Sequence, residues 1–236
     1  MIVPVLVPGG ATTFKADAVT FLNGQPSVLS APLGVEGKIN DFSWQQNADD
    51  DDLRDRLRCT PKAGSFADIE LWSGATLCAG AYEIRIVAAG ADVGVRYLPY
   101  QADKLTYMEL DAAARWIFTG PIEGCFVYVV THSGSTYLFH VNANTVPDPV
   151  ANALAKDTKL RAAVNALLPG GVITHRLSRS DYYPPADEKR PFRGFVYGRY
   201  TGAAWEFRYH SFIMNGAAAV PLYHAQPLPD GTGMLA

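Results

Sequence analysis

A threonine, a cysteine and a histidine lie close together in the middle of the chain. Thr119 precedes Cys125 by six residues, and His140 follows Cys125 by fifteen. A cysteine beside a histidine can act as a nucleophile, because the imidazole takes the thiol proton and the thiolate attacks a carbonyl carbon. A third group must then hold the imidazole in the productive tautomer. Thr119 or a main-chain carbonyl can fill that role.

The cysteine and the histidine lie on two segments that we expect to be strands of one hairpin. Residues 125–131 and 136–142 are rich in β-branched and aromatic side chains. The sequence His132-Ser133-Gly134-Ser135 between them is typical of a hairpin turn. The pattern therefore predicts two antiparallel neighbours joined by a tight turn.

The register of this hairpin decides whether the cysteine and the histidine can meet. If the turn centres on Ser133-Gly134, Tyr128 lies opposite Phe139, and the aromatic and aliphatic residues share one face. Cys125 and His140 are then diagonal neighbours on the other face, about 7 Å apart at the backbone. A three-residue loop would separate them and destroy the aromatic pairing. The apolar pattern therefore favours the register that brings them together.

Other interpretations of these residues remain open. Cys125 can be a structural core residue beside a satisfied histidine, since free cysteine packs as a small hydrophobe. His132, at the turn, is a second candidate base. We expect Cys59 and Cys78 to be inert packing residues.

Several short motifs carry a resemblance to a known family. Phe118-Thr119 leads into Gly124-Cys125, His140-Val141-Asn142-Ala143 follows, and Leu98-Pro99-Tyr100 lies upstream. Over about residues 95–145 this pattern resembles the catalytic core of the cysteine-dependent glutamine deamidase toxins. That family includes the Burkholderia lethal factor, the cytotoxic necrotizing factors and, more distantly, the bacterial chemoreceptor glutamine deamidases. The chain departs from it at Glu123, where the family has serine.

The resemblance implies an activity and roles for individual residues. Cys125 matches the catalytic cysteine, His140 the histidine and Thr119 the threonine of the family. The implied reaction is hydrolysis of a glutamine side-chain amide in a host protein through a thioester, with no cofactor. Main-chain N–H groups of Gly124 and Cys125 are candidate oxyanion donors. A carboxylate at Glu123 would oppose thiolate formation if it pointed toward the sulfur.

Two rival functions use the same residues differently. Cys125 and His140 could be the catalytic pair of another cysteine hydrolase, such as a peptidase, or of a transglutaminase. Alternatively, the chain is a non-enzymatic β-sandwich binding module in which Cys125 belongs to the core.

The pattern of elements predicts an α+β protein with a β-sheet sandwich core and flanking helices, similar to the necrotizing-factor deamidase catalytic domain. We expect a single domain over residues 1–236 with a catalytic core at about 95–215. Residues 148–168 have the clearest helical spacing, with Asp148 as cap and Pro149 at the first position. Residues 106–118 fit a helix or an extended lead-in, and residues 178–191 an exposed loop. Further runs predict strands: 2–7, 19–22, 38–44, 66–72, 82–88, 94–98, 172–177, 194–200 and 204–213.

Composition and charge indicate the class of protein and exclude some partners. Of the 236 residues, 48% are hydrophobic and 18% charged, which is typical of an ordered globular chain. The formal charge of -3 gives no case for nucleic acid or an anionic membrane. No apolar run approaches the roughly 20 residues of a membrane-spanning helix. Asp49-Asp50-Asp51-Asp52 lacks the spacing and glycine of a calcium loop, so we expect a solvated segment.

The start of the chain lacks the basic and long apolar regions of a Sec signal, and three cysteines without motif spacing fit a reducing compartment. The resemblance implies a host-directed bacterial toxin, so with these features we expect a protein made in the bacterial cytoplasm and delivered to the host cytosol by a specialised secretion system. We also expect it to be a monomer. Its expected partner is a host protein that presents an exposed glutamine.

A basic, aromatic-rich region could dock that substrate. Residues 175–210 contain seven Lys and Arg against four acids in an otherwise acidic chain. We expect Lys189, Arg190 and Arg193 to be docking residues, and the alternative is ordinary strand and loop surface. Nucleic acid is not an expected partner.

Overall fold

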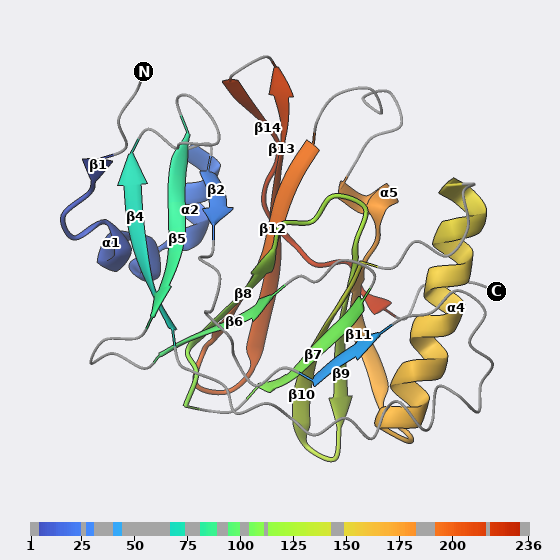
Figure 1. Ribbon diagram of the computed structural model, residues 1–236. Coiled ribbons are helices and arrows are strands. Elements are labelled where there is room, and N and C mark those ends of the chain that lie inside the picture. The colour runs from blue at the N-terminus through green and yellow to red at the C-terminus, as the bar shows by residue number, and fades with distance from the viewer. Residues whose placement is uncertain are drawn as a thin grey trace.

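The structure of the protein is a computed structural model, and it consists of two packed β-sheets with helices on their outer faces (Figure 1). It describes residues 5–24, 27–30, 40–43, 67–73, 81–88, 94–99, 104–110, 113–142, 149–182, 192–215 and 218–231. The helices are α1 (Gly10–Ala16), α2 (Ala18–Gly24), α4 (Pro149–Leu167) and α5 (Arg179–Tyr182). The mixed α/β architecture expected from the sequence is confirmed.

The larger sheet has nine strands. Its order is β14 (Ala218–Pro227), β13 (Trp205–Asn215), β12 (Phe192–Tyr200), β8 (Trp116–Gly120), β6 (Val95–Pro99), β4 (Ala67–Ser73), β5 (Tyr82–Ala88) and β2 (Ser27–Ser30), with β1 (Val5–Leu6) paired to β4. The β6–β8 and β2–β5 pairs are parallel, and the other pairs are antiparallel.

The smaller sheet has five antiparallel strands. Its order is β11 (Val172–Leu177), β9 (Phe126–His132), β10 (Ser135–Val141), β7 (Lys104–Leu110) and β3 (Asn40–Ser43). The chain passes from the larger sheet to the smaller one between β8 and β9. Residues 121–125 therefore connect the two layers.

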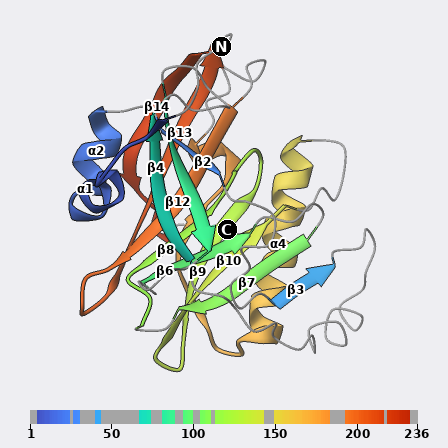
Figure 2. The same cartoon turned by 60° about the vertical axis from the view of Figure 1, so that its left-hand side comes forward.

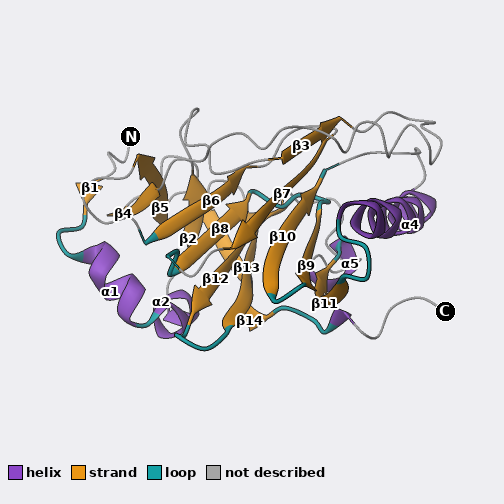
Figure 3. Ribbon diagram, turned by 90° about the horizontal axis from the view of Figure 1, so that it is seen from below, coloured by secondary structure: helices purple, strands orange, loops and turns teal. Residues whose placement is uncertain are grey.

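The side chains divide into three apolar layers because successive residues of a strand face opposite sides. The central layer lies between the sheets and includes Ile117, Cys125, Val127, Leu138 and Val196. One outer layer joins α1 and α2 to the larger sheet, and the other joins α4 to the smaller sheet. Seen from below in Figure 3, α1 and α2 lie at one end of the molecule and α4 at the opposite end. Figure 2 shows the same separation from another side.

The predicted hairpin is present with the predicted register. In the pairing of β9 with β10, Tyr128 lies opposite Phe139 and His132 opposite Ser135. The two turn residues, Ser133 and Gly134, have φ angles of 49° and 83°. Positive φ at both central residues is what a type I′ turn requires, and such turns match the twist of the strands. Turn chemistry and apolar pattern thus agree, as the sequence indicated.

Some sequence predictions about elements are wrong. Residues 19–22, predicted as a strand, belong to α2. The carboxylate of Asp17 accepts the N–H of Thr20 at 3.0 Å, as at the start of a helix, and Ala18 and Leu22 are buried one turn apart. Within residues 106–118 the helical alternative fails, because β7 and β8 are strands of different sheets.

Other predicted strands agree with the structure where it describes them, and β2 and β14 were not predicted. The acidic run at 49–52, Cys59 and Cys78 lie outside the described residues. Among the helices that the structure describes, none is long and apolar enough to cross a membrane.

Candidate active site

A hydrogen bond between the two sheets brings Thr119 and His140 together. Thr119 lies near the end of β8 in the larger sheet, and His140 lies on β10 in the smaller one. The Thr119 Oγ1 and His140 Nδ1 atoms are 2.6 Å apart, and both side chains are buried. This contact holds the imidazole ring and assigns Nδ1 to the threonine. Chemistry by this histidine must therefore use Nε2.

Cys125 lies on the same side of the hairpin as His140. The register pairs His140 with Val127, and Cys125 precedes Val127 by two residues on the same strand path. Cys125, Val127 and Leu138 pack in the central layer between the sheets. Cys125 and His140 are thus diagonal neighbours, as predicted. His132 extends the opposite face of β9, the face that packs on α4, so it does not lie beside the thiol.

The segment that carries Cys125 is fixed at several points. The Ile122 N–H donates to the Gly194 carbonyl of β12 at 2.8 Å. The Tyr182 hydroxyl accepts the Gly124 N–H at 2.8 Å and donates to the Cys125 carbonyl at 2.9 Å. Gly124 has a φ of 113°, a conformation that favours glycine. The backbone around the cysteine is therefore held in one shape.

Lys156 on α4 adds a positive charge close to this segment. Its Nζ donates to the Gly124 carbonyl at 3.2 Å, although only 3% of the residue is exposed. The neighbouring Asp157 is buried as well, and its carboxylate accepts hydrogen bonds from Arg161 at 2.9 Å and Arg176 at 3.2 Å. These ion pairs connect α4 to β11 and so keep Lys156 against the cysteine segment.

Burial has the largest effect on the pKa values of Cys125 and His140. It raises the pKa of the Cys125 thiol from 9.0 to about 11, and a backbone hydrogen bond from Glu123 and the charge of Lys156 oppose that rise. Burial also lowers the pKa of His140 from 6.5 to about 3. With the site closed, the pair is a neutral thiol beside a neutral imidazole. Desolvation disfavours the charged forms of both groups.

Glu123, the departure from the family pattern, is exposed to solvent. Its carboxylate raises the pKa of Cys125, in the direction expected from the sequence, but it contributes less than burial, the backbone or Lys156. Because the residue is exposed, water screens its charge. Its opposition to thiolate formation is therefore small.

The two oxyanion candidates differ in availability. The Gly124 N–H is already donated to the Tyr182 hydroxyl. It could donate to a substrate oxygen only after Tyr182 moved. The Cys125 N–H remains a candidate donor.

Sequence reasoning missed Tyr182, Lys156 and Asp157. Tyr182 was expected in an exposed loop, but it is fully buried at the end of α5. Only the three-dimensional packing of α5 on the cysteine segment reveals its role. Lys156 and Asp157 precede Leu160 by about one helical turn, so helical spacing places them on the buried face of α4. That signal was present in the sequence.

Of the predicted docking residues, Lys189 and Arg190 lie outside the described residues, as does the side chain of Arg193. Arg176, counted in the same basic region, is paired internally with Asp157. Within the described ranges, no three His, Cys, Asp or Glu side chains come together as they would around a metal ion.

Comparison of the chain with protein-family models and with curated protein sequences finds no match. The relation to the deamidase toxins is therefore a resemblance carried by the motifs within residues 95–145.

The buried imidazole should make stability depend on pH. Because the pKa of His140 is lower in the folded than in the unfolded state, the unfolded chain binds the extra proton between about pH 6.5 and 3. The contribution to stability is complete above the unfolded pKa and is lost as pH falls. We expect an additional slope of up to about 1.4 kcal/mol per pH unit in that window. Urea unfolding of the wild type and His140→Gln at several pH values measures it. Equal slopes in the two proteins would contradict a buried neutral imidazole.

Two substitutions should change the reactivity of Cys125 in opposite directions. Lys156→Met removes a cation and should raise the pKa of the thiol, which slows alkylation several-fold at fixed pH. Glu123→Gln removes an anion and should accelerate it by a smaller factor, because the carboxylate is exposed. Iodoacetamide rates between pH 7 and 9, in a background with Cys59 and Cys78 replaced by serine, measure both effects. Changes of the same sign would show that the two substitutions act on access to the sulfur and not on its charge.

Proposed function

We propose that the protein is a cysteine-dependent amidohydrolase that deamidates a glutamine side chain in a target protein. The observation that carries this proposal is the 2.6 Å contact between Thr119 Oγ1 and His140 Nδ1 on the face of the hairpin that also carries Cys125. A histidine held at Nδ1 leaves Nε2 to act as the proton acceptor. Cys125, His140 and Thr119 would then supply a nucleophile, a base and an orienting group.

The proposed reaction proceeds in two steps. Cys125 Sγ attacks the amide carbon while His140 Nε2 takes the thiol proton. The imidazolium then gives that proton to the leaving amine, the C–N bond breaks, and ammonia departs from a thioester. In the second step His140 deprotonates water, which attacks the thioester carbon. The proton returns to sulfur, which releases glutamate and the free thiol.

The low polarity of the site favours a neutral resting pair over a thiolate and imidazolium. In this proposal proton transfer accompanies attack on the substrate, and the nearby cation and the N–H groups stabilise the charge that develops. Lys156, which donates to the Gly124 carbonyl, is the cation among the described groups whose charge lowers the pKa of Cys125. Fixed charges of this kind act strongly where water is excluded.

A protein substrate must also reach the sulfur. Only 1% of Cys125 is exposed, so reaction requires that segments around the cysteine separate. The clamp formed by the Tyr182 hydroxyl on Gly124 and Cys125 is the contact that such a movement would break. Its release would also free the Gly124 N–H for the substrate oxygen.

The resemblance to the deamidase toxins supports the choice of glutamine over other amides, and the two-sheet architecture with outer helices is compatible with it. On this proposal the protein is a bacterial effector that acts on a host protein in the host cytosol. Lys189, Arg190 and Arg193 remain the proposed docking residues.

The burial of Cys125 favours a second candidate function, a non-catalytic β-sandwich binding module. A thiol that is 1% exposed and whose pKa is raised to about 11 is also what a core cysteine looks like. In that case the Thr119–His140 contact only satisfies two buried polar groups. The two functions differ in one respect, which is whether the thiol reacts.

Peptide mass analysis of host-cell lysate after incubation with the protein tests the proposal. We expect a gain of about 1 Da on a glutamine of one target, together with released ammonia. Cys125→Ser should lower the rate by a factor of about 1000 or more, because a hydroxyl is far less acidic and less nucleophilic than a thiol in a site arranged for sulfur. The Cys59→Ser variant serves as the control and should retain activity.

Other outcomes would assign a different function. Cleavage of the target chain would indicate a peptidase, and incorporation of an added amine a transglutaminase. Activity that survives in Cys125→Ser, or no modified glutamine in any lysate together with an unreactive native Cys125, would contradict the proposal and favour the binding module.

A further inference from the structure

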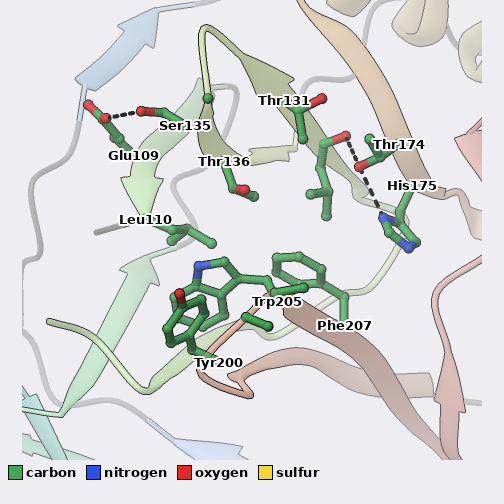
Figure 4. Close-up of a pocket in the computed structure, with 14 residues that line it drawn as sticks. Glu109, Leu110, Thr131, Ser135, Thr136, Thr174, His175, Tyr200, Trp205 and Phe207 are labelled. Atoms are coloured by element: carbon green, nitrogen blue, oxygen red, sulfur yellow. Dashed lines mark hydrogen bonds between the residues drawn. The ribbon is translucent and has the colours of Figure 1, made fainter. Parts of the chain in front are cut away.

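A cavity of about 510 Å³ opens between the two sheets (Figure 4). It lies between the turn that joins β9 to β10 and the turn that joins β12 to β13. Cys125 and Thr131 are separated along β9 by about 20 Å, at roughly 3.3 Å per residue. The cavity is therefore distinct from the proposed catalytic site. Its volume falls in the usual range of small-molecule sites.

Aromatic rings form one wall of this cavity. Trp205 lies between its two neighbours, with ring centroids 5.6 Å from Tyr200 and 6.0 Å from Phe207. The Trp205 and Phe207 rings are stacked, with an angle of 23° between their planes. Tyr200 and Trp205 are only partly buried. The structure thus holds a broad apolar surface open toward the cavity.

Hydroxyl groups line the opposite wall. Thr131 and Thr136 are directly opposed on β9 and β10, on the face that turns toward the larger sheet. Neither hydroxyl makes a hydrogen bond with another of the described residues, and the same is true of the Tyr200 hydroxyl and the Trp205 indole N–H. Figure 4 shows Thr131 and Thr136 across the space from the aromatic rings. Polar groups that lack a protein partner beside a cavity are available to a ligand.

The charge of the lining excludes some ligands. No lysine or arginine is among the lining residues that the structure describes, so an anion would find no opposite charge there. Glu109 is the one carboxylate among the described lining residues. The register puts its side chain on the outer face of the smaller sheet with Tyr137, opposite to Leu110 and Thr136, and there it accepts a hydrogen bond from the Ser135 hydroxyl at 2.7 Å. Its carboxylate is therefore turned away from the space between the sheets, and water screens its charge because the residue is exposed. The remaining groups suit a neutral ligand.

We propose that this cavity binds a neutral sugar ring. A pyranose has one face of C–H groups, which would lie against Trp205 and Tyr200, and a rim of hydroxyls that both donate and accept hydrogen bonds. Thr131 and Thr136 offer neighbouring hydroxyls on the opposite wall. The cavity is large enough for one ring with some space for a second. This inference does not depend on the proposed amidohydrolase activity.

Ligand-observed saturation-transfer NMR with the full chain tests it, using methyl glycosides of glucose, galactose, mannose and N-acetylglucosamine as separate probes. We expect at least one to bind with a dissociation constant that titration can measure. The Thr131→Val and Thr136→Val substitutions keep the shape and the strand preference of the side chains. Each should weaken binding by about fivefold, the usual effect of one lost neutral hydrogen bond. Trp205→Ala should abolish it.

Thr158→Val is the matched control, since Thr158 is exposed on α4 and its hydroxyl bonds only the Leu154 carbonyl within the described residues. It should bind the sugar as the wild type does. Circular dichroism shows whether each variant is folded. If Trp205→Ala does not fold, the two valine variants decide the test. Binding of no glycoside at about 50 mM, far above the millimolar range of weak ligands, would overturn the proposal. Lysine amide serves as a cationic probe, and binding of this probe but of no sugar would also overturn the proposal. Sugar binding that neither valine variant weakens would overturn it as well.

Discussion

The hydrogen bond between Thr119 and His140 is the contact on which the arrangement of the site depends. Both groups are buried between two sheets, where a polar atom without a partner costs about 1–3 kcal/mol. The bond satisfies them only if β8 of one sheet and β10 of the other stand at a fixed position relative to each other. It therefore links the alignment of the two sheets to the orientation of one imidazole ring. Cys125 enters this arrangement through the register of the hairpin.

The segment between β8 and β9 connects the two sheets that this contact joins, and it is held at several points. This segment leaves the larger sheet directly after Thr119 and enters the smaller sheet directly after Cys125, so any shift in it would move both ends of the site. Tyr182 binds both a donor and an acceptor of its backbone, and Lys156 binds the Gly124 carbonyl. Burying the charged lysine is unfavourable. At this position its charge opposes the rise in the pKa of the Cys125 thiol.

The hairpin could be predicted from sequence because its information is local. The pairing of Tyr128 with Phe139 follows from a two-residue period and from a turn whose residues tolerate positive φ. Tyr182 could not be predicted, because it lies 57 residues from Cys125 and nothing in its own segment indicates a buried partner. The helix at residues 18–24 was missed because tertiary packing of Ala18 and Leu22 outweighs the strand preference of Val19 and Thr20. The aromatic wall of the cavity likewise depends on how the two sheets face each other.

The protonation of His140 tests the central claim most directly. Long-range ¹H–¹⁵N correlation spectra of imidazole nitrogens distinguish the two neutral tautomers from the imidazolium, and His140→Gln identifies the signals of this residue. If Thr119 orients the ring so that Nε2 can take the thiol proton, His140 must be neutral at pH 7 with its hydrogen on Nδ1, donated to the threonine hydroxyl. A hydrogen on Nε2 would mean that this nitrogen cannot accept the proton of Cys125, and an imidazolium would mean that the site is not the dry, neutral environment described here. Either result would contradict the account.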